Sequence, residues 1–496
     1  MSRVSLLVER ACPWISRGQG RGGKKIVSAV KTAILVVGIV GLGYFLGASL
    51  MTASGPSAIA VVSILALLFL AVAEPLYGLV INIVLYPLSV HFATIQLGKG
   101  IPNISPDRLV IACLLAVFFF RTMTGRQGFH YRNRVYLAAL FFLVFYSLSF
   151  RNQTLTFSAA SQFLLDKWML PIVVYFIVSN LVVDERKLHG VLNLLLGLGV
   201  YSAVYMMYEQ ATGSVLFEVR QEAATFYTGT GLRIVRGLYG TTTTFGNLFN
   251  LLIPVALYFF LKARTVGKKA WYGLAFLVML AGVLLTYKRA VWLGAIVSFL
   301  IICWFYPQFR KLFVVILFVF SLGIAASWDT VSRSEVVTSR ITGTDDWQDA
   351  NGRTQRWEAG MEYWRQNPLF GAGYKIYKQG EYEQVENLYI HLLASAGLVA
   401  FVPFVIMLLS TVRDSVDVFR RLGKRMFVER NLITIFWGGF GAYWFMAYFG
   451  SGIEGHPISN YTLFVMMGAI VGSQVPLLGR SAREPKCAQD PGAGTG

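Results

Sequence analysis

The chain has 496 residues, of which 55% are hydrophobic, 15% are aromatic and only 14% are charged. The apolar residues recur in runs of about 20, the length that crosses a bilayer as an α-helix, and the runs lack the alternation of an outer-membrane barrel. The formal net charge of +19 does not indicate a nucleic acid partner, because Lys and Arg lie mainly in short loops and form no basic patch with interleaved aromatics. Composition therefore predicts an all-α, polytopic integral membrane protein surrounded by membrane lipids.

Residues 1–31 form a basic amino-terminal segment that includes Arg10, Arg17 and Lys31. Segments rich in Lys and Arg beside a span stay in the cytoplasm by the positive-inside rule. The first apolar run, 32–51, has no clear small-residue cleavage site after it, so we expect it to be retained as a span. The amino terminus is therefore predicted to be cytoplasmic.

The apolar runs predict about 14 transmembrane helices in one membrane domain, 32–478. Counted from a cytoplasmic start, the long loops 209–243 and 329–386 lie on the extracytoplasmic side. The tail, 479–496, is rich in Gly, Pro and charge and is predicted to be disordered in the cytoplasm. The cysteines show no disulfide or metal-ligand spacing; they are Cys12, Cys113, Cys303 and Cys487. The predicted spans are 32–51, 56–73, 76–94, 107–122, 135–150, 164–182, 188–208, 244–261, 270–286, 291–306, 312–328, 387–410, 432–450 and 461–478.

The first long loop carries Arg233 and Arg236 shortly before a predicted helix. Arginine beside a helix amino end suits an anionic ligand, because the backbone N–H groups and the guanidinium both favour negative charge. Thr243, Thr244 and Asn247 are the candidate caps of that helix. Turn residues are also required wherever a chain re-enters the membrane, so both a binding role and a purely structural role remain open for this loop.

Lys288 and Arg289 lie in a tight turn between two apolar spans, on the side that the positive-inside rule leaves poor in cations. One explanation is that both side chains extend to lipid headgroups. The other is a phosphate-binding site, in which the planar guanidinium of Arg289 binds two oxygens while Lys288 acts as a point charge.

The second long loop is predicted to contain an amphipathic helix over 353–366, because apolar residues that include Trp357 recur there at three- and four-residue spacing. Asn351 and Thr354 are its candidate caps, and Pro368 is expected to end it. Trp357 would either lie at the bilayer surface or stack on a sugar ring.

Glu386, Asn387 and His391 lie where the chain re-enters the membrane. A carboxylate at the membrane edge could accept a proton from a sugar hydroxyl, as a general base does. It could equally favour the helix amino end through the helix dipole. His391 lies within the apolar run and is offset from Glu386 by about 140° around a helix, so the two need not share a face.

An ordered set of residues in this chain resembles the bacterial O-antigen ligase and Wzy-type polymerase superfamily, most strongly over about 230–400. In chain order the set is Arg236, Gly237, Lys288, Arg289, Trp292, Leu293, Gly294, Gly352, Arg353, Trp357, Pro368, Gly371, Gly373, Asn387, Leu388, Tyr389, Gly397 and Leu398. The resemblance implies a GT-C-like membrane fold and glycosyl transfer outside the inner membrane, without a metal or other cofactor.

The donor implied by the resemblance is a glycan linked to undecaprenyl pyrophosphate. Residues matching the family arginines, Arg236 and Arg289, would bind the pyrophosphate. Flippase and chain-length regulator proteins are the partners that the resemblance implies. The further residues expected to bind substrate are Arg233, Lys288, Arg353, Trp357, Asn387 and His391.

Many family members have a His-Asn pair where this chain has Glu386 and Asn387. We therefore predict Glu386 as the catalytic base, with His391 as the alternative. The glutamate in place of this histidine favours a polymerase of surface polysaccharide, such as exopolysaccharide, capsule or O-antigen. It speaks against a ligase that transfers the glycan to lipid A core or protein. A transporter of lipid-linked sugars is the alternative from another class, although most predicted spans lack the charged residues that line translocation pathways.

Overall fold

The computed structural model describes residues 66–92, 105–124, 134–152, 157–214, 226–227, 233–235, 237–239, 241–307, 309–311, 313–314, 347–373, 385–421, 428–450 and 457–472. These residues are almost entirely helical. The two strands among them, β1 (Phe226–Tyr227) and β2 (Arg233–Ile234), form one short antiparallel pair. The all-α prediction is thus confirmed except for this pair. The predicted span 32–51 and most of 312–328 lie outside the described residues, as do the termini 1–31 and 479–496.

The helices follow the predicted apolar runs in order. Before the first long loop they are α4 (Pro75–Phe92), α5 (Pro106–Met123), α6 (Arg134–Leu148), α7 (Phe157–Leu164), α8 (Leu170–Leu181) and α9 (Glu185–Thr212), with a 3₁₀ turn at Ser149–Asn152 and a π-helical turn at Leu165–Met169. That loop contains a 3₁₀ turn (Gly237–Tyr239). From its end onward the helices are α10 (Thr242–Lys262), α11 (Val266–Leu285), α12 (Arg289–Phe305), α16 (Trp347–Gln366), α17 (Leu388–Arg421), α18 (Arg430–Tyr448) and α19 (Pro457–Gly472).

Within the described residues, 5 helices are long and apolar enough to cross a membrane. Four further apolar helices are shorter, and they include α12 (Arg289–Phe305). A helix rises about 1.5 Å per residue, so a span needs about 20 residues. These helices are those of a membrane protein, and the total of about 14 spans remains a prediction.

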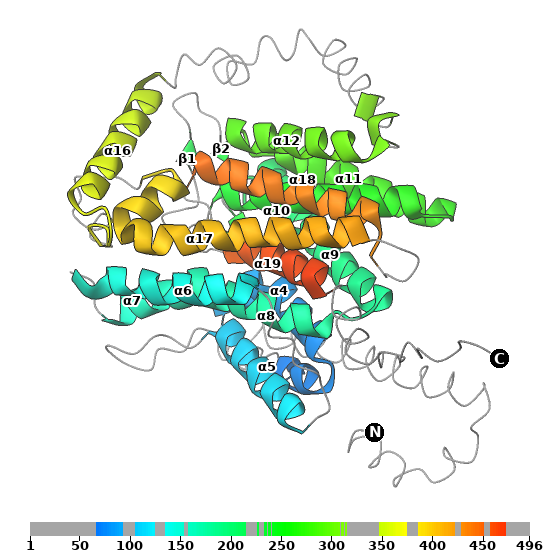
Figure 1. The fold of residues 1–496 in the computed structure, drawn as a ribbon. Helices are drawn as coiled ribbons and strands as arrows, with labels where there is room; N and C mark the ends of the chain where they lie inside the picture. Colours follow the sequence, from blue (N-terminus) through cyan, green and yellow to red (C-terminus); the bar gives the residue numbers. More distant parts are fainter. Residues whose placement is uncertain are drawn as a thin grey trace, which may run out of the picture. The chain divides into compact units, whose positions relative to one another are not determined.

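Helix α10 lies at the centre of the helices described. Of its most apolar stretch, 89% is buried, whereas the corresponding stretch of α11 is only 28% buried. α10 contacts α9, α11, α12, α18 and α19 (Figure 1). Glycine allows the closest of these contacts, because a Cβ at Gly246 would come within 2.3 Å of the Val291 side chain on α12. Small residues at such positions let helix backbones approach each other, as in other membrane proteins.

The outer helices leave apolar stripes uncovered. On α12 the exposed residues Leu293, Ile296 and Leu300 recur at three- and four-residue spacing. The carboxyl half of α17 exposes a similar stripe that includes Val402 and Leu409. Continuous apolar faces of this size mark contact with lipid or another apolar partner. They therefore agree with a position of these helices in the bilayer.

Candidate active site

The centre of the candidate site is an ion pair between α16, in the second long loop, and the residue that precedes the cap of α17. Arg353 Nε on α16 donates to Glu386 Oε2 at 2.8 Å, and the two side chains are 37% and 38% exposed. Both residues were predicted to belong to the site, and the structure brings them together. A charge-assisted hydrogen bond of this kind orients a carboxylate while leaving its second oxygen available.

Asn387 caps α17. Its Oδ1 accepts from the backbone N–H groups of Tyr389 at 3.0 Å and Ile390 at 3.2 Å. Its side chain is buried, with 1% exposure for the residue. The cap is therefore Asn387, and Glu386 is the residue before it.

His391 lies one turn into α17 and is buried in the helix bundle. Its backbone N–H donates to the Asn387 carbonyl at 2.9 Å, and its own carbonyl accepts from Ser395 Oγ at 2.7 Å. The two candidate bases thus differ in accessibility, because Glu386 is 38% exposed and His391 is 1% exposed. Of these two candidate bases, only the Glu386 carboxylate is accessible to solvent in this structure.

Helix α16 packs against the start of α17 and the end of α18. The Trp357 ring packs edge-on against Tyr448 with centroids 5.3 Å apart. A Cβ at Gly360 would lie 2.8 Å from the Ile390 side chain, so α16 comes close to α17 at this point. Figure 1 shows α16 beside the amino-terminal part of α17. The ring of Trp357 is therefore packed against α18, a contact that the sequence did not predict.

Helix α17 is discontinuous. Gly397 has φ 67° and ψ −170°, which interrupts the helix between 388–396 and 398–421. The segment 368–373, hereafter the crossing segment, lies across this break. Its carbonyls at Pro368 and Leu369 accept from the N–H groups of Leu398 and Val399 at 3.0 and 3.1 Å. The backbone groups that the break releases are therefore bonded, as non-helical backbone within a membrane protein requires.

The other side of the break is bonded in the same way. Ala372 N–H and Gly373 N–H donate to the carbonyls of Ala394 and Ser395 at 2.8 and 3.0 Å. Gly371, with φ 68°, has no room for a Cβ, which would lie 2.5 Å from the backbone of Ser395 and Ala396. Glycine at 371 therefore allows the two backbones to approach each other.

Arg289 begins α12, directly after the turn that the sequence predicted. Tyr287 has φ 49°, and Thr286 Oγ1 donates to the Val283 carbonyl at 2.6 Å. Trp292 Nε1 donates to the same carbonyl at 3.0 Å, which fixes the turn against the first turn of α12. Lys288 is exposed and Arg289 is half-buried.

The start of α12 shares one end of the bundle with the Glu386 region. Asn250 Nδ2 on α10 donates to the Val291 carbonyl at 3.0 Å and contacts the sulfur of Met446 near the end of α18 at the same distance. Two residues from Met446, the Trp444 carbonyl accepts from Tyr389 Oη at 2.9 Å. α18 therefore links the amino end of α12, which carries Arg289, to the amino end of α17.

The first long loop is described only in part. Arg233 lies in β2, where its backbone pairs with Tyr227, and Arg236 lies outside the described residues. The predicted cap of α10 was wrong, because the cap is Thr241, whose side chain accepts from the Thr244 N–H at 3.4 Å. The caps predicted for α16 were wrong too: the helix begins earlier, at Trp347, so that Asn351 and Thr354 lie inside it.

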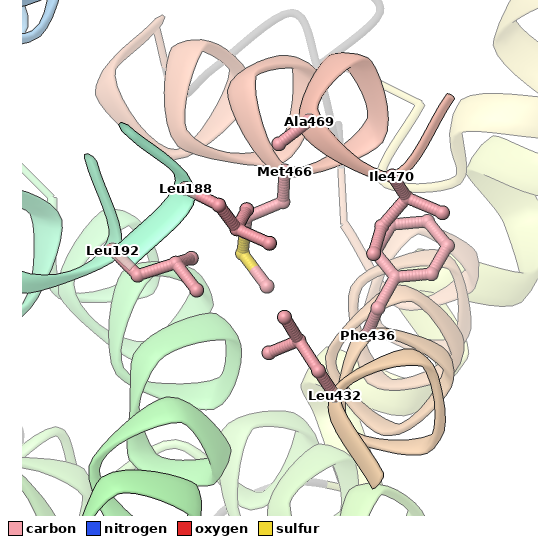
Figure 2. Close-up of a pocket in the computed structure, with 7 residues that line it drawn as sticks. All are labelled: Leu188, Leu192, Leu432, Phe436, Met466, Ala469 and Ile470. Carbon is pink, nitrogen blue, oxygen red and sulfur yellow. The ribbon is translucent and has the colours of Figure 1, made fainter. Parts of the chain in front are cut away.

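A small apolar cavity lies away from this site, between α9, α18 and α19 (Figure 2). Its volume is about 10 Å³, which holds at most about one water molecule. All its lining side chains are apolar: Leu188, Leu192, Leu432, Phe436, Met466, Ala469 and Ile470. It offers no group that would bind a sugar or a phosphate.

Comparison with known proteins identifies a related family for part of the chain. Residues 274–405 match a family model described as O-antigen ligase. A search of curated proteins gives no match. The matched segment includes Lys288, Arg289, Arg353, Trp357, Glu386, Asn387 and His391, and it leaves out Arg233 and Arg236. The match over residues 274–405 of this membrane protein confirms the resemblance to the O-antigen ligase superfamily that was predicted from the sequence.

Proposed function

We propose that the protein is a membrane glycosyltransferase that polymerises undecaprenyl-pyrophosphate-linked repeat units of a surface polysaccharide on the outer face of the inner membrane. The observation that carries this proposal is the family match over 274–405, the segment that contains both Arg289 and Glu386. Glycan processing in the membrane is the general activity of that family. The ion pair that holds Glu386 at an accessible edge of the bundle supports a base at this position.

In the proposed reaction the oxygen of an acceptor sugar hydroxyl attacks the anomeric carbon of the donor. The hydroxyl proton passes to the Glu386 carboxylate as the new glycosidic bond forms. The bond between the anomeric carbon and the pyrophosphate oxygen breaks, and the pyrophosphate leaves with the bonding electron pair. Arg289 and Arg236 would stabilise the charge that develops on this leaving group, because fixed guanidinium groups near lipid need little reorganisation.

Arg353 has a different role in this proposal. Its guanidinium lies on the carboxylate that accepts the proton, so it orients Glu386 and does not contact the leaving group. Lys288, which is exposed beside Arg289, would add positive charge for the pyrophosphate. Arg233 would contribute to binding from the first long loop.

The second candidate function is an O-antigen ligase, which transfers a finished glycan to lipid A core or protein. The description of the matching family model favours it. The glutamate at 386, where many family members have histidine, favours the polymerase. A transporter of lipid-linked sugars would catalyse no transfer.

The test uses purified protein with lipid-linked repeat units extracted from a strain that lacks this gene. The reaction contains a chelator and no nucleotide sugar, and products are separated by size. A ladder of products spaced by one repeat unit is the expected result. Unchanged donor would contradict the polymerase, and product formation only after addition of lipid A core or acceptor protein would establish the ligase.

A further inference from the structure

In the side-chain amide of Asn387, the oxygen is hydrogen-bonded to the backbone of α17 and the nitrogen is not. Its Oδ1 accepts from two backbone N–H groups at 3.0 and 3.2 Å. Because only the oxygen of a side-chain amide accepts hydrogen bonds, these two contacts fix which end of the amide is oxygen and which is nitrogen. Nδ2 is therefore the end of the amide that does not face these two N–H groups.

Nδ2 has no hydrogen-bond acceptor among the residues that the structure describes, although it is buried. Asn387 as a whole is 1% exposed. A buried amide donor without an acceptor costs about 1–3 kcal/mol, so native structures seldom keep one without a reason. The cap itself does not require it, since serine or aspartate would cap the helix equally well.

The neighbouring groups indicate what the donor would bind. Glu386 is the preceding residue, and its carboxylate accepts the Arg353 hydrogen bond at 2.8 Å. A second anion, such as a phosphate, would be repelled by this carboxylate, whereas a sugar hydroxyl can donate to the carboxylate and accept from the amide at once. The pair of Glu386 and Asn387 therefore matches a neutral ligand that carries hydroxyl groups.

We propose that Asn387 Nδ2 is a fixed donor to a hydroxyl oxygen of the acceptor glycan, beside the base Glu386. This inference rests on the proposed function and assigns a ligand class to one half of its site. The helix cap holds the amide in one orientation before the glycan arrives, so little side-chain entropy is lost on binding. The glycan would enter beside Glu386, whose side chain is 38% exposed, and displace the packing that covers the amide.

Three substitutions separate this role from capping. Asn387→Ser and Asn387→Asp keep a cap acceptor for α17, and both lose the amide donor, since aspartate has no N–H and the shorter serine hydroxyl does not reach the position of Nδ2. Asn387→Ala loses the cap and the donor together. Because serine is neutral and aspartate is charged, an effect that both share cannot come from added charge beside Glu386.

The probe is the repeat-unit oligosaccharide released from its lipid by mild acid, titrated into detergent-solubilised protein by calorimetry. We expect all three variants to bind it about tenfold more weakly than the parent, the effect of one lost hydrogen bond. Only Asn387→Ala should also lower the melting temperature. Asp184→Ala is the matched control, since Asp184 caps α9 by accepting from Lys187 N–H at 2.8 Å, and it should lower the melting temperature without changing the affinity.

Parent-like affinity in the serine and aspartate variants would overturn the inference, as would a parent protein that does not bind the oligosaccharide. Equilibrium binding does not depend on turnover. A parent protein that binds the glycan through Asn387 but forms no product would contradict the proposed transfer reaction and leave the assignment of Asn387 intact.

Discussion

At the scale of single residues, the candidate site depends on one carboxylate and the groups that hold it. The sequence indicated both Arg353 and Glu386 but gave no sign that they are partners, since 33 positions separate them. Their contact requires α16 to fold back on the start of α17. Loop length and composition do not determine that arrangement. The sequence predicted substrate binding for Arg353, whereas the observed ion pair is the basis for the proposal that Arg353 positions Glu386.

Arg353→Gln should reduce the rate of glycan transfer by about 10- to 100-fold, because a base displaced by about 1 Å loses that much efficiency. The KM for the lipid-linked donor should change little, since Arg353 does not contact the pyrophosphate in this account. Arg365→Gln is the control, because Arg365 forms an exposed pair with Glu362 on the same helix at 3.5 Å. Equal rates in the two variants would show that the Arg353 contact does not position the base.

Arg289→Lys keeps the charge but loses the planar fork that binds two phosphate oxygens. We expect transfer activity to fall by about tenfold or more, with normal membrane insertion, because a charge-assisted bidentate contact is worth about 1.5–3 kcal/mol. Arg310→Lys is the matched control at the other end of α12, where Arg310 donates to the Cys303 and Trp304 carbonyls. Full activity of Arg289→Lys in the same assay would indicate that the Arg289 side chain only contacts lipid headgroups.

At the scale of secondary structure, the discontinuous α17 is the feature that organises the site. The crossing segment follows α16, which carries Arg353, and makes four backbone hydrogen bonds across the break, two with each half of α17. These bonds connect the end of α16 to both halves of α17. The chain needs glycine at this crossing because both backbones lie too close for a side chain.

Gly371→Ala and Gly397→Ala should each lower the melting temperature strongly. Both positions have positive φ, a conformation that costs alanine about 1–3 kcal/mol of backbone strain. In addition, a Cβ at Gly397 would lie 2.2 Å from the Leu369 carbonyl oxygen. Gly197→Ala is the contrasting control, because nothing lies within 4 Å of a Cβ there and the helix should gain about 0.5–1 kcal/mol. A melting temperature of Gly371→Ala equal to that of the parent would show that the crossing tolerates a side chain.

Helix positions could be predicted from the sequence, whereas helix caps could not. The spacing around Trp357 correctly predicted the helix over 353–366 within α16. The run of four threonines at the start of α10 contains several residues able to cap it, and the choice of Thr241 depends on where the preceding turn leaves the backbone extended. The break at Gly397 was hidden for a related reason, since an apolar run with one glycine is equally compatible with a continuous helix.

At the scale of the whole molecule, the two ends of the bundle differ in chemistry. The end with Arg289 and Glu386 carries the candidate site. At the other ends of α9, α10 and α18, Lys262 Nζ pairs with Glu185 at 2.9 Å and with Glu429 at 2.7 Å. Sequence reasoning missed this cluster, because its members lie far apart in the chain and only the packing of three helices brings them together.

Lys262→Met should lower the melting temperature by an amount equivalent to about 1 kcal/mol, the upper range for an exposed ion pair, because the cluster is partly solvated. The transfer rate per folded molecule should stay unchanged, since the cluster lies at the end opposite to the site. Lys269→Met, on the exposed first turn of α11, is expected to leave the melting temperature as it is. A loss of transfer rate in correctly folded Lys262→Met protein would show that the two ends are coupled.

The central claim is that Glu386 is the base of a glycosyl transfer reaction. The most direct measurement compares the parent protein with Glu386→Gln in the size-resolved assay with lipid-linked repeat units, because glutamine keeps the shape of the side chain and cannot accept the proton. We predict a ladder of products from the parent and a rate lower by about 10²- to 10⁴-fold from the variant, the usual contribution of a general base. A ladder of equal length and rate from folded Glu386→Gln protein would contradict the account.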